Sequence, residues 1–266
     1  MIRRRRRHPH ADLLLEGRWL PVTRSMSFIR ADPQTCIDVF EKRTGHVVLE
    51  RFGSPRRVRE VAGDGIEQLL AALLPLDDEG HRHLLVRTAN PDWTAVFTNH
   101  WRGGRSHLAA QMGMGGLRVV TATDVPHTIN LLRTRGDWGD RSLVLWEPWP
   151  ERQVRHGTVD WMLHHVQAGV GDRGWFFHAG SGYTDERLDI PFPLGRVWDE
   201  RALRAVHKFD HDHLVEACRM LGLRPFDADF YAPDAAGLIL ERSDLPAPDE
   251  RSYTLAQARG EERVDR

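Results

Sequence analysis

Lysine is almost missing from this chain of 266 residues. Lys42 and Lys208 are its two lysines, so 35 of the 37 basic residues are arginines. Acidic residues number 38, and the formal net charge is −1. A chain this close to neutral has no overall field that would attract it to nucleic acid or to an anionic membrane. We interpret the arginine excess as the codon bias of a GC-rich bacterial genome, although arginine also suits a surface that binds phosphate or carboxylate groups.

Cysteine is equally scarce. Cys36 and Cys218 are the two cysteines, and they lie far apart in the chain. Such a pair makes neither a disulfide framework nor a zinc motif. Both residues fall in apolar helical patterns, which predicts buried free thiols rather than reactive ones. We therefore expect the reducing environment of the cytoplasm.

Long apolar runs are also lacking. No stretch reaches the ~18 consecutive apolar residues of a membrane-spanning helix. The basic run Arg3 to Arg7 is followed by a short apolar run, Leu13 to Leu15, and then by Glu16. A secretory signal needs a longer apolar region at this point. We expect neither a membrane segment nor export.

The two ends of the chain are polar and charged. Residues 1–12 are expected to form a disordered basic arm, and residues 242–266 a mobile tail. A basic arm can bind nucleic acid through the phosphate backbone. Short basic tails are common and unspecific, however, so nucleic-acid binding is an alternative function rather than the leading one.

Between these ends, apolar periodicity predicts an alternation of strands and helices. The expected strands cover residues 25–30, 46–52, 82–88, 93–98, 117–122, 142–146, 153–167, 174–179 and 238–240. The expected helices begin at Pro33 and cover residues 64–74, 105–112, 199–206 and 210–221. No linker divides the chain, so we predict a single α+β domain over residues 13–241. Its sheet should be mixed or mainly antiparallel, with helices mostly on one face.

The first helix has the clearest boundary signals. Asp32 can cap its N-terminus, and Pro33 suits the first helical position, where no backbone N–H is needed. Gly45 is expected to end the helix in a left-handed conformation. His46 to Phe52 should then form a strand.

One loop combines polar and basic side chains with glycine. Gly103 and Gly104 would let the backbone approach a ligand between a strand and a helix, where free N–H groups suit an anion. Arg102 and Arg105 could grip a phosphate or carboxylate. The loop matches no nucleotide-binding motif, and a glycine turn with solvated arginines explains it equally well. The candidate ligand-binding residues are Asn99, His100, Arg102, Arg105 and His127.

A histidine cluster later in the chain is the richest set of potential metal ligands. His207 and His211 have the i,i+4 spacing of helical metal sites, and His213 lies close by. Asp210 resembles a helix N-cap, however, which would separate the first two histidines. No complete ligand pattern is present, so we expect no metal and no cofactor.

Tryptophan is frequent, with nine residues. Tryptophan anchors protein interfaces because a large apolar ring carries one polar N–H. Trp138 and Trp149 lie in loops beside glycine or proline, so we expect them to contact a protein partner.

These observations favour a binding protein. A core-forming pattern without a complete catalytic constellation suggests a cytoplasmic protein that masks a partner, for example an immunity-type protein. The alternative is an enzyme that acts on an anionic small molecule at the 99–106 loop. The second alternative is nucleic-acid binding through the basic arm.

Overall fold

The computed structural model describes residues 9–104, 106–129, 136–153, 159–183, 186–188, 192–243 and 251–264. Of the expected basic arm, residues 1–8 lie outside this set, so its disorder and nucleic-acid binding stay predictions. Among the described residues, no helix is both long enough and apolar enough to cross a membrane.

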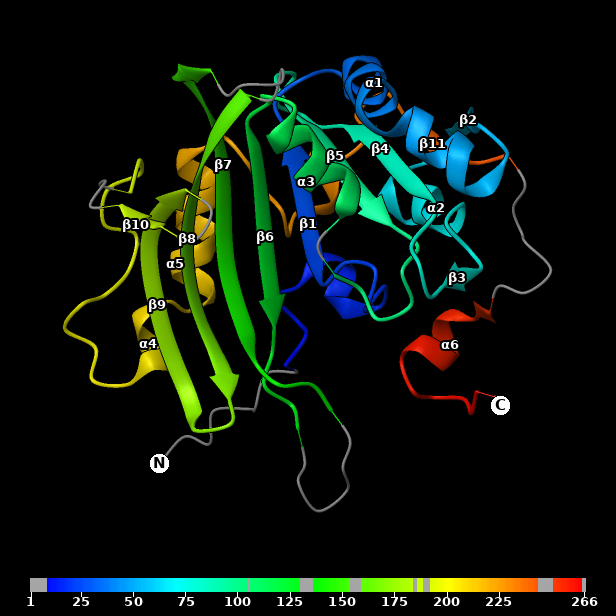
Figure 1. The fold of residues 1–266 in the computed structure, drawn as a ribbon. Helices are drawn as coiled ribbons and strands as arrows, with labels where there is room; N and C mark the ends of the chain where they lie inside the picture. Colours follow the sequence, from blue (N-terminus) through cyan, green and yellow to red (C-terminus); the bar gives the residue numbers. More distant parts are fainter. Residues whose placement is uncertain are drawn as a thin grey trace.

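A single antiparallel sheet of ten strands runs through the molecule (Figure 1). The strand order is β10-β9-β8-β7-β6-β1-β5-β4-β11-β2, and a separate pair, β12-β3, lies beside it. The strands are β1 (Ser25–Ile29), β2 (Arg56–Ala62), β3 (Leu76–Asp77), β4 (His83–Arg87), β5 (Thr94–Thr98), β6 (Val119–Val125), β7 (Asp140–Gln153), β8 (Val159–Gly171), β9 (Gly174–Tyr183), β10 (Glu186–Leu188), β11 (Ala236–Arg242) and β12 (Ser252–Tyr253). The predicted α+β fold is confirmed, and the sheet is antiparallel.

Strand β1 is the central member of this sheet. It pairs with β6 on one side and β5 on the other, and all five of its residues are buried. Its two serines bond to threonines directly across from them on β6, at 2.7 Å for Ser25 with Thr123 and 3.0 Å for Ser27 with Thr121. A one-residue slip would break both bonds and turn the apolar side chains to the wrong face.

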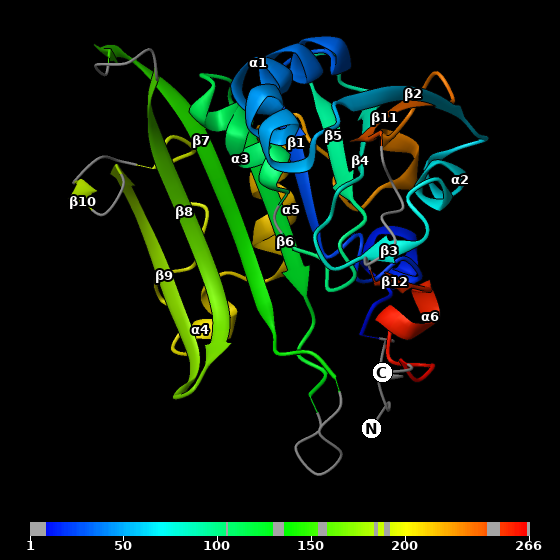
Figure 2. The same ribbon diagram turned by 45° about the vertical axis from the view of Figure 1, so that its right-hand side comes forward.

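Helices cover both faces of the sheet (Figure 2). Helices α1 and α3 pack on one face, and α2 and α5 on the other. The central strands are buried on both sides, so they carry apolar residues on both faces and need helices on each. The helices are α1 (Pro33–Phe52), α2 (Ile66–Ala71), α3 (His107–Met114), α4 (Ala205–Lys208), α5 (His211–Met220) and α6 (Leu255–Ala258), with 3-10 turns η1 (Leu14–Gly17) and η2 (Ala228–Phe230).

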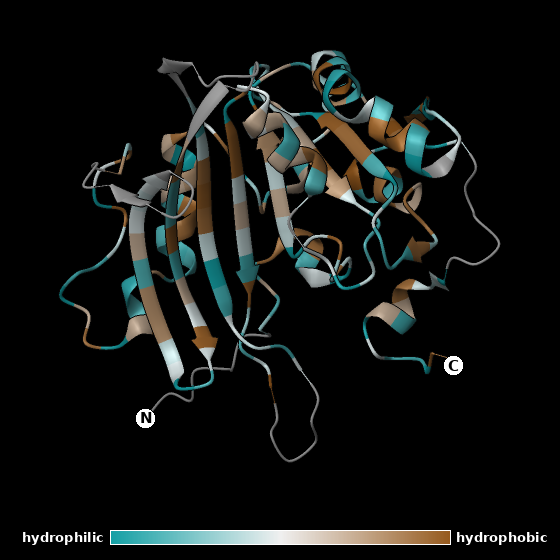
Figure 3. Cartoon of the chain, in the orientation of Figure 1, coloured by the Kyte–Doolittle hydropathy of each residue, from teal (hydrophilic) through white to brown (hydrophobic). Residues whose placement is uncertain are grey.

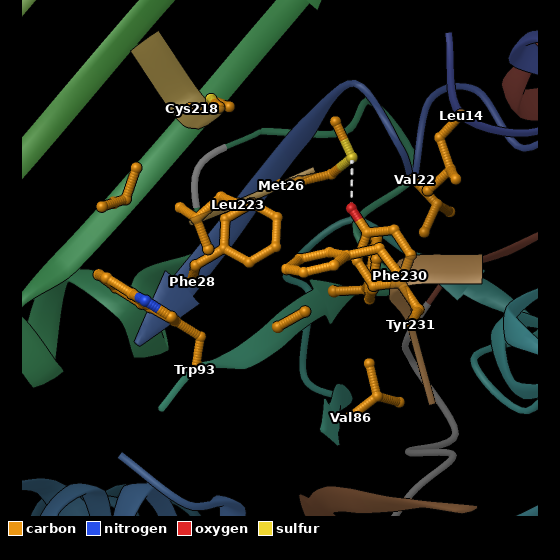
Figure 4. Close-up of a cluster of buried hydrophobic side chains, with 14 of the residues drawn as sticks. Leu14, Val22, Met26, Phe28, Val86, Trp93, Cys218, Leu223, Phe230 and Tyr231 are labelled. Atoms are coloured by element: carbon orange, nitrogen blue, oxygen red, sulfur yellow. Dashed lines mark hydrogen bonds between the residues drawn. The ribbon is translucent and has the colours of Figure 1, made fainter. Parts of the chain in front are cut away.

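The larger core lies on the α5 face. Met26 and Phe28 of β1 point into it, and Phe28 contacts the rings of Phe230 and Tyr231 at centroid distances of 6.2 Å (Figure 4). The buried hydroxyl of Tyr231 donates to the carbonyl of Pro225 at 2.6 Å, so it is not left unsatisfied. Hydropathy follows the same arrangement, with apolar stretches along the inner strands and polar residues towards the turns (Figure 3).

Helix α1 is longer than the sequence suggested. The Asp32 carboxylate accepts from the backbone N–H of Thr35 at 3.0 Å, which confirms the N-cap. The helix then continues through Gly45 and ends at Gly53, whose φ of 70° is the left-handed stop. The stop at Gly45 and the strand over 46–52 were therefore wrong. Val48, only 7% exposed, extends the apolar stripe past the glycine and keeps the helix against the protein.

Three other expectations about elements were wrong. Residues 199–206 do not form a helix; a single turn, α4, lies at 205–208. Residues 153–167 are not one strand, because β7 ends at Gln153 and β8 begins at Val159. Strand β2 was not expected at all. It lies at the sheet edge with mostly charged, exposed side chains, a composition that discourages edge-to-edge aggregation.

The C-terminal segment is not a free tail, which corrects the expectation for 242–266. Residues 251–264 fold back as β12 and α6, and β12 pairs with β3. Tyr253 is buried and stacks on Trp101, with ring centroids 4.5 Å apart and planes inclined by 11°. Arg242 also belongs to the fold, because it ends β11 and is 5% exposed.

We predict that Tyr253→Ala releases this segment from the rest of the protein. The change removes a buried ring and an aromatic pair worth about 0.5–1.5 kcal/mol beyond its burial. Limited proteolysis should cut the 251–264 region several-fold faster, while the sheet stays protected. Ser252→Ala, at the exposed neighbouring position, is the control. Equal cleavage rates for the two variants would contradict the anchoring role.

Candidate functional site: a basic pocket between helices α1 and α3

The 99–106 loop, which the sequence indicated as a candidate ligand site, begins with Asn99, a residue that stabilises the fold. Asn99 is fully buried, and its amide nitrogen donates to Asp77 at 2.8 Å. Its amide oxygen accepts from the backbone N–H of Arg82 at 2.9 Å. Asp77 in turn accepts from the backbone N–H groups of Glu79 and Gly80. Asn99 therefore does not face a ligand; it fixes the shape of the loop 77–82.

The next residues of that loop are partly accounted for by local contacts. The His100 Nδ1 atom accepts from the backbone N–H of Arg102 at 3.2 Å. The Arg102 guanidinium lies over the Trp101 ring, 4.6 Å from its centroid. Gly103 has a φ of 63° and lies so close to the Pro21 carbonyl that no side chain would fit. Arg105 lies outside the described residues, so its role stays a prediction.

His127 belongs to another neighbourhood. Its Nδ1 atom accepts from the backbone N–H of Gly139 at 3.2 Å, and its ring contacts Trp138 and Trp175 at centroid distances of 5.9 and 5.7 Å. Trp138 is 52% exposed, as expected for a partner-binding residue. The side chain of Trp149 lies outside the described part of the structure.

The three candidate metal ligands, His207, His211 and His213, have different partners or lie in different helices. His211 Nδ1 lies 2.7 Å from the buried carboxylate of Asp124, which Arg141 also contacts at 2.9 Å. His213 closes a capping box with Asp210 at the start of α5. His207 lies in α4, before that cap. Among the described residues, no three His, Cys, Asp or Glu side chains are grouped so that they could hold a metal ion.

A basic pocket is the most distinctive site in the structure. It lies between the C-terminal half of α1, the start of α3 and the edge of the sheet at β2, β4 and β11, and its volume is about 540 Å³. The loop 77–82, fixed by Asn99, forms one wall. The basic side chains that line it are Arg43, Arg51, Arg56, Arg242, His81, His83 and His107, and Glu79 is the acidic one.

The ring of Phe40 organises part of this lining. The Arg56 guanidinium lies over the ring at 4.3 Å from its centroid. The imidazoles of His83 and His107 meet the ring edge-on, at centroid distances of 5.9 and 6.4 Å. Arg56 also donates to Glu41 at 2.9 Å and to Thr44 at 3.0 Å, so α1 holds it in place.

Two arginines from neighbouring strands lie directly opposite each other in the lining of the pocket. Arg56 of β2 and Arg242 of β11 are direct cross-strand partners, and their side chains are 11% and 5% exposed. Like charges directly opposite on a sheet are destabilising. Glu41 compensates Arg56, and the Arg242 guanidinium lies 3.1 Å from the Nε2 atom of His81.

His83 is a buried polar group in the lining of the pocket. It is 6% exposed, and its Nδ1 atom has no hydrogen-bond partner among the described residues. Burial lowers the pKa of His83 to about 3, and the charges of Arg56, His107 and His81 act in the same direction. The imidazole is therefore neutral at pH 7. A buried polar atom without a partner is unusual, and an absent ligand is one explanation for it.

Arg43 is a second group without a partner. It makes no ion pair or hydrogen bond with any described residue, and its Nε atom is buried. The pocket thus combines an orphaned imidazole nitrogen, an uncompensated guanidinium and two opposed buried arginines. Guanidinium groups bind carboxylates and phosphates through paired, charge-assisted hydrogen bonds. This arrangement can bind an anion.

Sequence reasoning did not find this pocket because its members are dispersed over α1, β2, β4, α3 and β11. The sequence also predicted that α1 ends at Gly45 and that a strand follows. Val47, Val48 and Arg51 were therefore not recognised as residues of the helix that line the pocket together. The available signal was the closely spaced pair His81 and His83 on one strand segment of a chain where arginine is abundant. The 99–106 loop was adjacent to the site without being its centre.

Comparison with known proteins does not identify a relative. No protein-family model matches the chain, and no curated protein or solved structure matches it. Function is therefore argued from the residues of this chain.

We predict that Asn99→Ala destabilises the protein and loosens the pocket wall. The change leaves Asp77 and the Arg82 N–H with one partner fewer, and an unsatisfied buried group costs about 1–3 kcal/mol. Urea denaturation should show this loss. The control is Asn90→Ala, because the half-buried Asn90 side chain bonds near the surface, donating to the Gly222 carbonyl and accepting from the Asp92 N–H, each at 3.2 Å. If both variants lose the same small amount, Asn99 does not anchor the loop.

We also predict that the contact between His211 and Asp124 makes stability depend on pH. Burial alone would lower the pKa of His211, but the hydrogen bond and charge of Asp124 outweigh it and raise the pKa. A raised pKa stabilises the fold below the unfolded value of about 6.5, and this stabilisation is lost as pH rises through the folded value. In urea denaturation, Asp124→Asn should therefore cost more stability at pH 6 than at pH 8.

The control for this prediction is Asp137→Asn, because Asp137 pairs with Arg24 and not with a histidine. Its cost should be the same at both pH values. A cost of Asp124→Asn that does not change with pH would show that His211 does not titrate against this carboxylate.

Proposed function

We propose that this protein binds a small anionic molecule in the basic pocket between α1 and α3. The observation that carries the proposal is the buried Nδ1 atom of His83, without a partner among the described residues, in a pocket lined by four arginines. An anion would give this atom a partner and would bring a negative charge to Arg43, which makes no ion pair with a described residue. The apolar side chains of Phe40, Val47 and Val48 also line the pocket and could contact an uncharged part of the ligand.

The sequence suggested an anionic small molecule as an alternative ligand, at the 99–106 loop. The proposal keeps this class of ligand and assigns it to the basic pocket. The 99–106 loop contributes indirectly, since Asn99 shapes the wall that carries Glu79 and His81, and α3 begins with His107 directly after the loop. The pocket supports binding, and we propose no catalytic step. Free, buried Cys36 and Cys218 support a cytoplasmic location as part of the proposal.

A protein partner is the second candidate. The exposed ring of Trp138, which lies against His127, supports a contact surface at this end of the sheet. Exposed tryptophan is a common anchor of protein interfaces. Masking of a protein partner therefore remains the alternative proposal, at a surface distinct from the basic pocket.

We predict that Arg43→Gln weakens anion binding about tenfold, the effect of losing one charge-assisted interaction of ~1.5 kcal/mol. Arg43 is suited to this test because it has no partner in the fold whose loss would disturb the structure. Sulfate and inorganic phosphate are the probes. Their affinities are measured from the rise in melting temperature with anion concentration.

Lys42→Gln is the matched control, since it removes the same charge from the exposed neighbouring position on α1. It should leave the affinity unchanged. If neither anion stabilises the unmodified protein, or if the two variants lose affinity equally, the pocket is not an anion site.

A further inference from the structure

We propose that His211 is a general base for the hydrolysis of uncharged carboxylic esters, in a second cavity that is separate from the basic pocket. This cavity has a volume of about 410 Å³ and is formed by residues 11–13, one side of α5 and the segment 223–227. None of the described residues that line it belongs to the basic pocket. The inference therefore goes beyond the anion binding proposed above.

The carboxylate of Asp124 orients the imidazole of His211. Asp124 lies on β6 with its side chain 2% exposed, and its Oδ2 atom is 2.7 Å from the Nδ1 atom of His211. Its Oδ1 atom is 2.9 Å from the Nε atom of Arg141, so the carboxylate is held from two sides. A carboxylate can only accept a hydrogen bond from Nδ1–H. This contact therefore favours the neutral tautomer in which Nε2 carries the lone pair.

The Nε2 atom of His211 is the nitrogen that remains for a ligand. His211 lines the cavity with its side chain 23% exposed, whereas Asp124 does not line it. Nε2 makes no hydrogen bond with any described residue. The ring of Phe226 lies beside the imidazole, with the two centroids 4.8 Å apart, and restricts its rotation. The geometry thus combines one fixed nitrogen with one that is open to a ligand.

A histidine with these contacts is suited to remove a proton from a nucleophile. In hydrolytic sites, the base lies within reach of the nucleophile and is oriented by a third group, which here is Asp124. Burial alone would lower the pKa of His211, but Asp124 raises it and so strengthens the base. The described lining of the cavity contains no serine, threonine or cysteine. Water is therefore the nucleophile that we propose.

The hydrolysis needs only the ester, one water molecule and His211. The water oxygen adds to the carbonyl carbon while Nε2 takes one of the water protons. The tetrahedral intermediate then collapses, the bond between the carbonyl carbon and the alkoxy oxygen breaks, and the proton on Nε2 passes to that oxygen. The products are a carboxylic acid and an alcohol, and the imidazole returns to its neutral form.

The lining of the cavity favours an uncharged ester with an apolar acyl group. Its two arginines already have carboxylate partners, since Arg224 contacts Asp227 at 3.3 Å and Arg219 donates twice to Glu216 at 2.8 Å. Much of the remaining lining is apolar: Leu13, Val215, Leu223, Pro225 and Phe226. Val215 is 36% exposed, and an acyl chain placed against it would remove apolar surface from water.

The test uses p-nitrophenyl butyrate with the full-length protein at pH 8, and the absorbance of the released p-nitrophenolate gives the rate. We expect saturable hydrolysis above the rate in buffer and above that of free imidazole at the concentration of the protein's histidines. The butyrate ester should have a lower KM than the acetate ester, because the longer acyl chain covers more of the apolar lining.

Variants at three positions separate the base, its orientation and the substrate contact. In His211→Gln the amide can still donate to Asp124 but cannot take a proton, so kcat should fall at least tenfold. Asp124→Asn acts through His211 as a positioning change, so kcat should fall by a similar factor while KM stays the same. Val215→Asn should raise the KM of the butyrate ester and leave that of the acetate ester unchanged.

His46→Gln is the control, since it removes an exposed imidazole from α1 and should leave both constants unchanged. Thermal melting curves check that each variant is folded, and His211→Gln decides the question if Asp124→Asn is not. The proposal would be overturned if hydrolysis did not exceed that of free imidazole, or if His211→Gln kept the kcat of the unmodified protein. An equal loss in His46→Gln, or a change of KM alone in Asp124→Asn, would also contradict it.

Discussion

The continuity of helix α1 is the constraint on which the pocket depends. The helix passes Gly45 and reaches Phe52, so Arg43, Val47 and Arg51 lie on its pocket side. Phe40 and Thr44 hold Arg56 of the edge strand against the same helix. Glycine in a helix costs about 1 kcal/mol relative to alanine. The ion pair and cation–π contact of Arg56, together with burial of Val48, offset that cost and keep the helix intact.

A second set of contacts fixes the opposite wall. Asn99 and Asp77 form a buried hydrogen-bonded pair that holds the backbone of the 77–82 loop at Glu79, Gly80 and Arg82. Because polar groups buried in this way must all be satisfied, the loop has one favoured shape. The wall that carries His81 is therefore preorganised, so less conformational entropy would be lost when a ligand binds.

The α+β class, the N-cap at Asp32 and most inner strands could be predicted because each depends on neighbouring residues. Periodicity reports which side chains are apolar, and caps report local hydrogen bonds. The stop predicted at Gly45 was wrong for the same reason. Glycine locally favours a helix end, whereas the contacts of Arg56 from β2 with α1 maintain the helix. The candidate loop was predicted in the right region, but Asn99 proved to be a structural residue. Its partners Asp77 and Arg82 belong to a distant segment, and sequence spacing does not reveal such pairs.

The position of the arginines bears on the proposed anion binding, because burial of charge does not favour stability. A charged side chain at a protein surface costs little free energy of folding. Arg56 and Arg242, however, are mostly buried and lie opposite each other on neighbouring strands. Replacing buried charges by apolar side chains of similar size is often neutral or stabilising. Stability alone therefore gives no reason to keep two arginines and a neutral, unpartnered His83 around one cavity. The proposed anion would supply that reason, because it would complete the hydrogen bonding of the histidine.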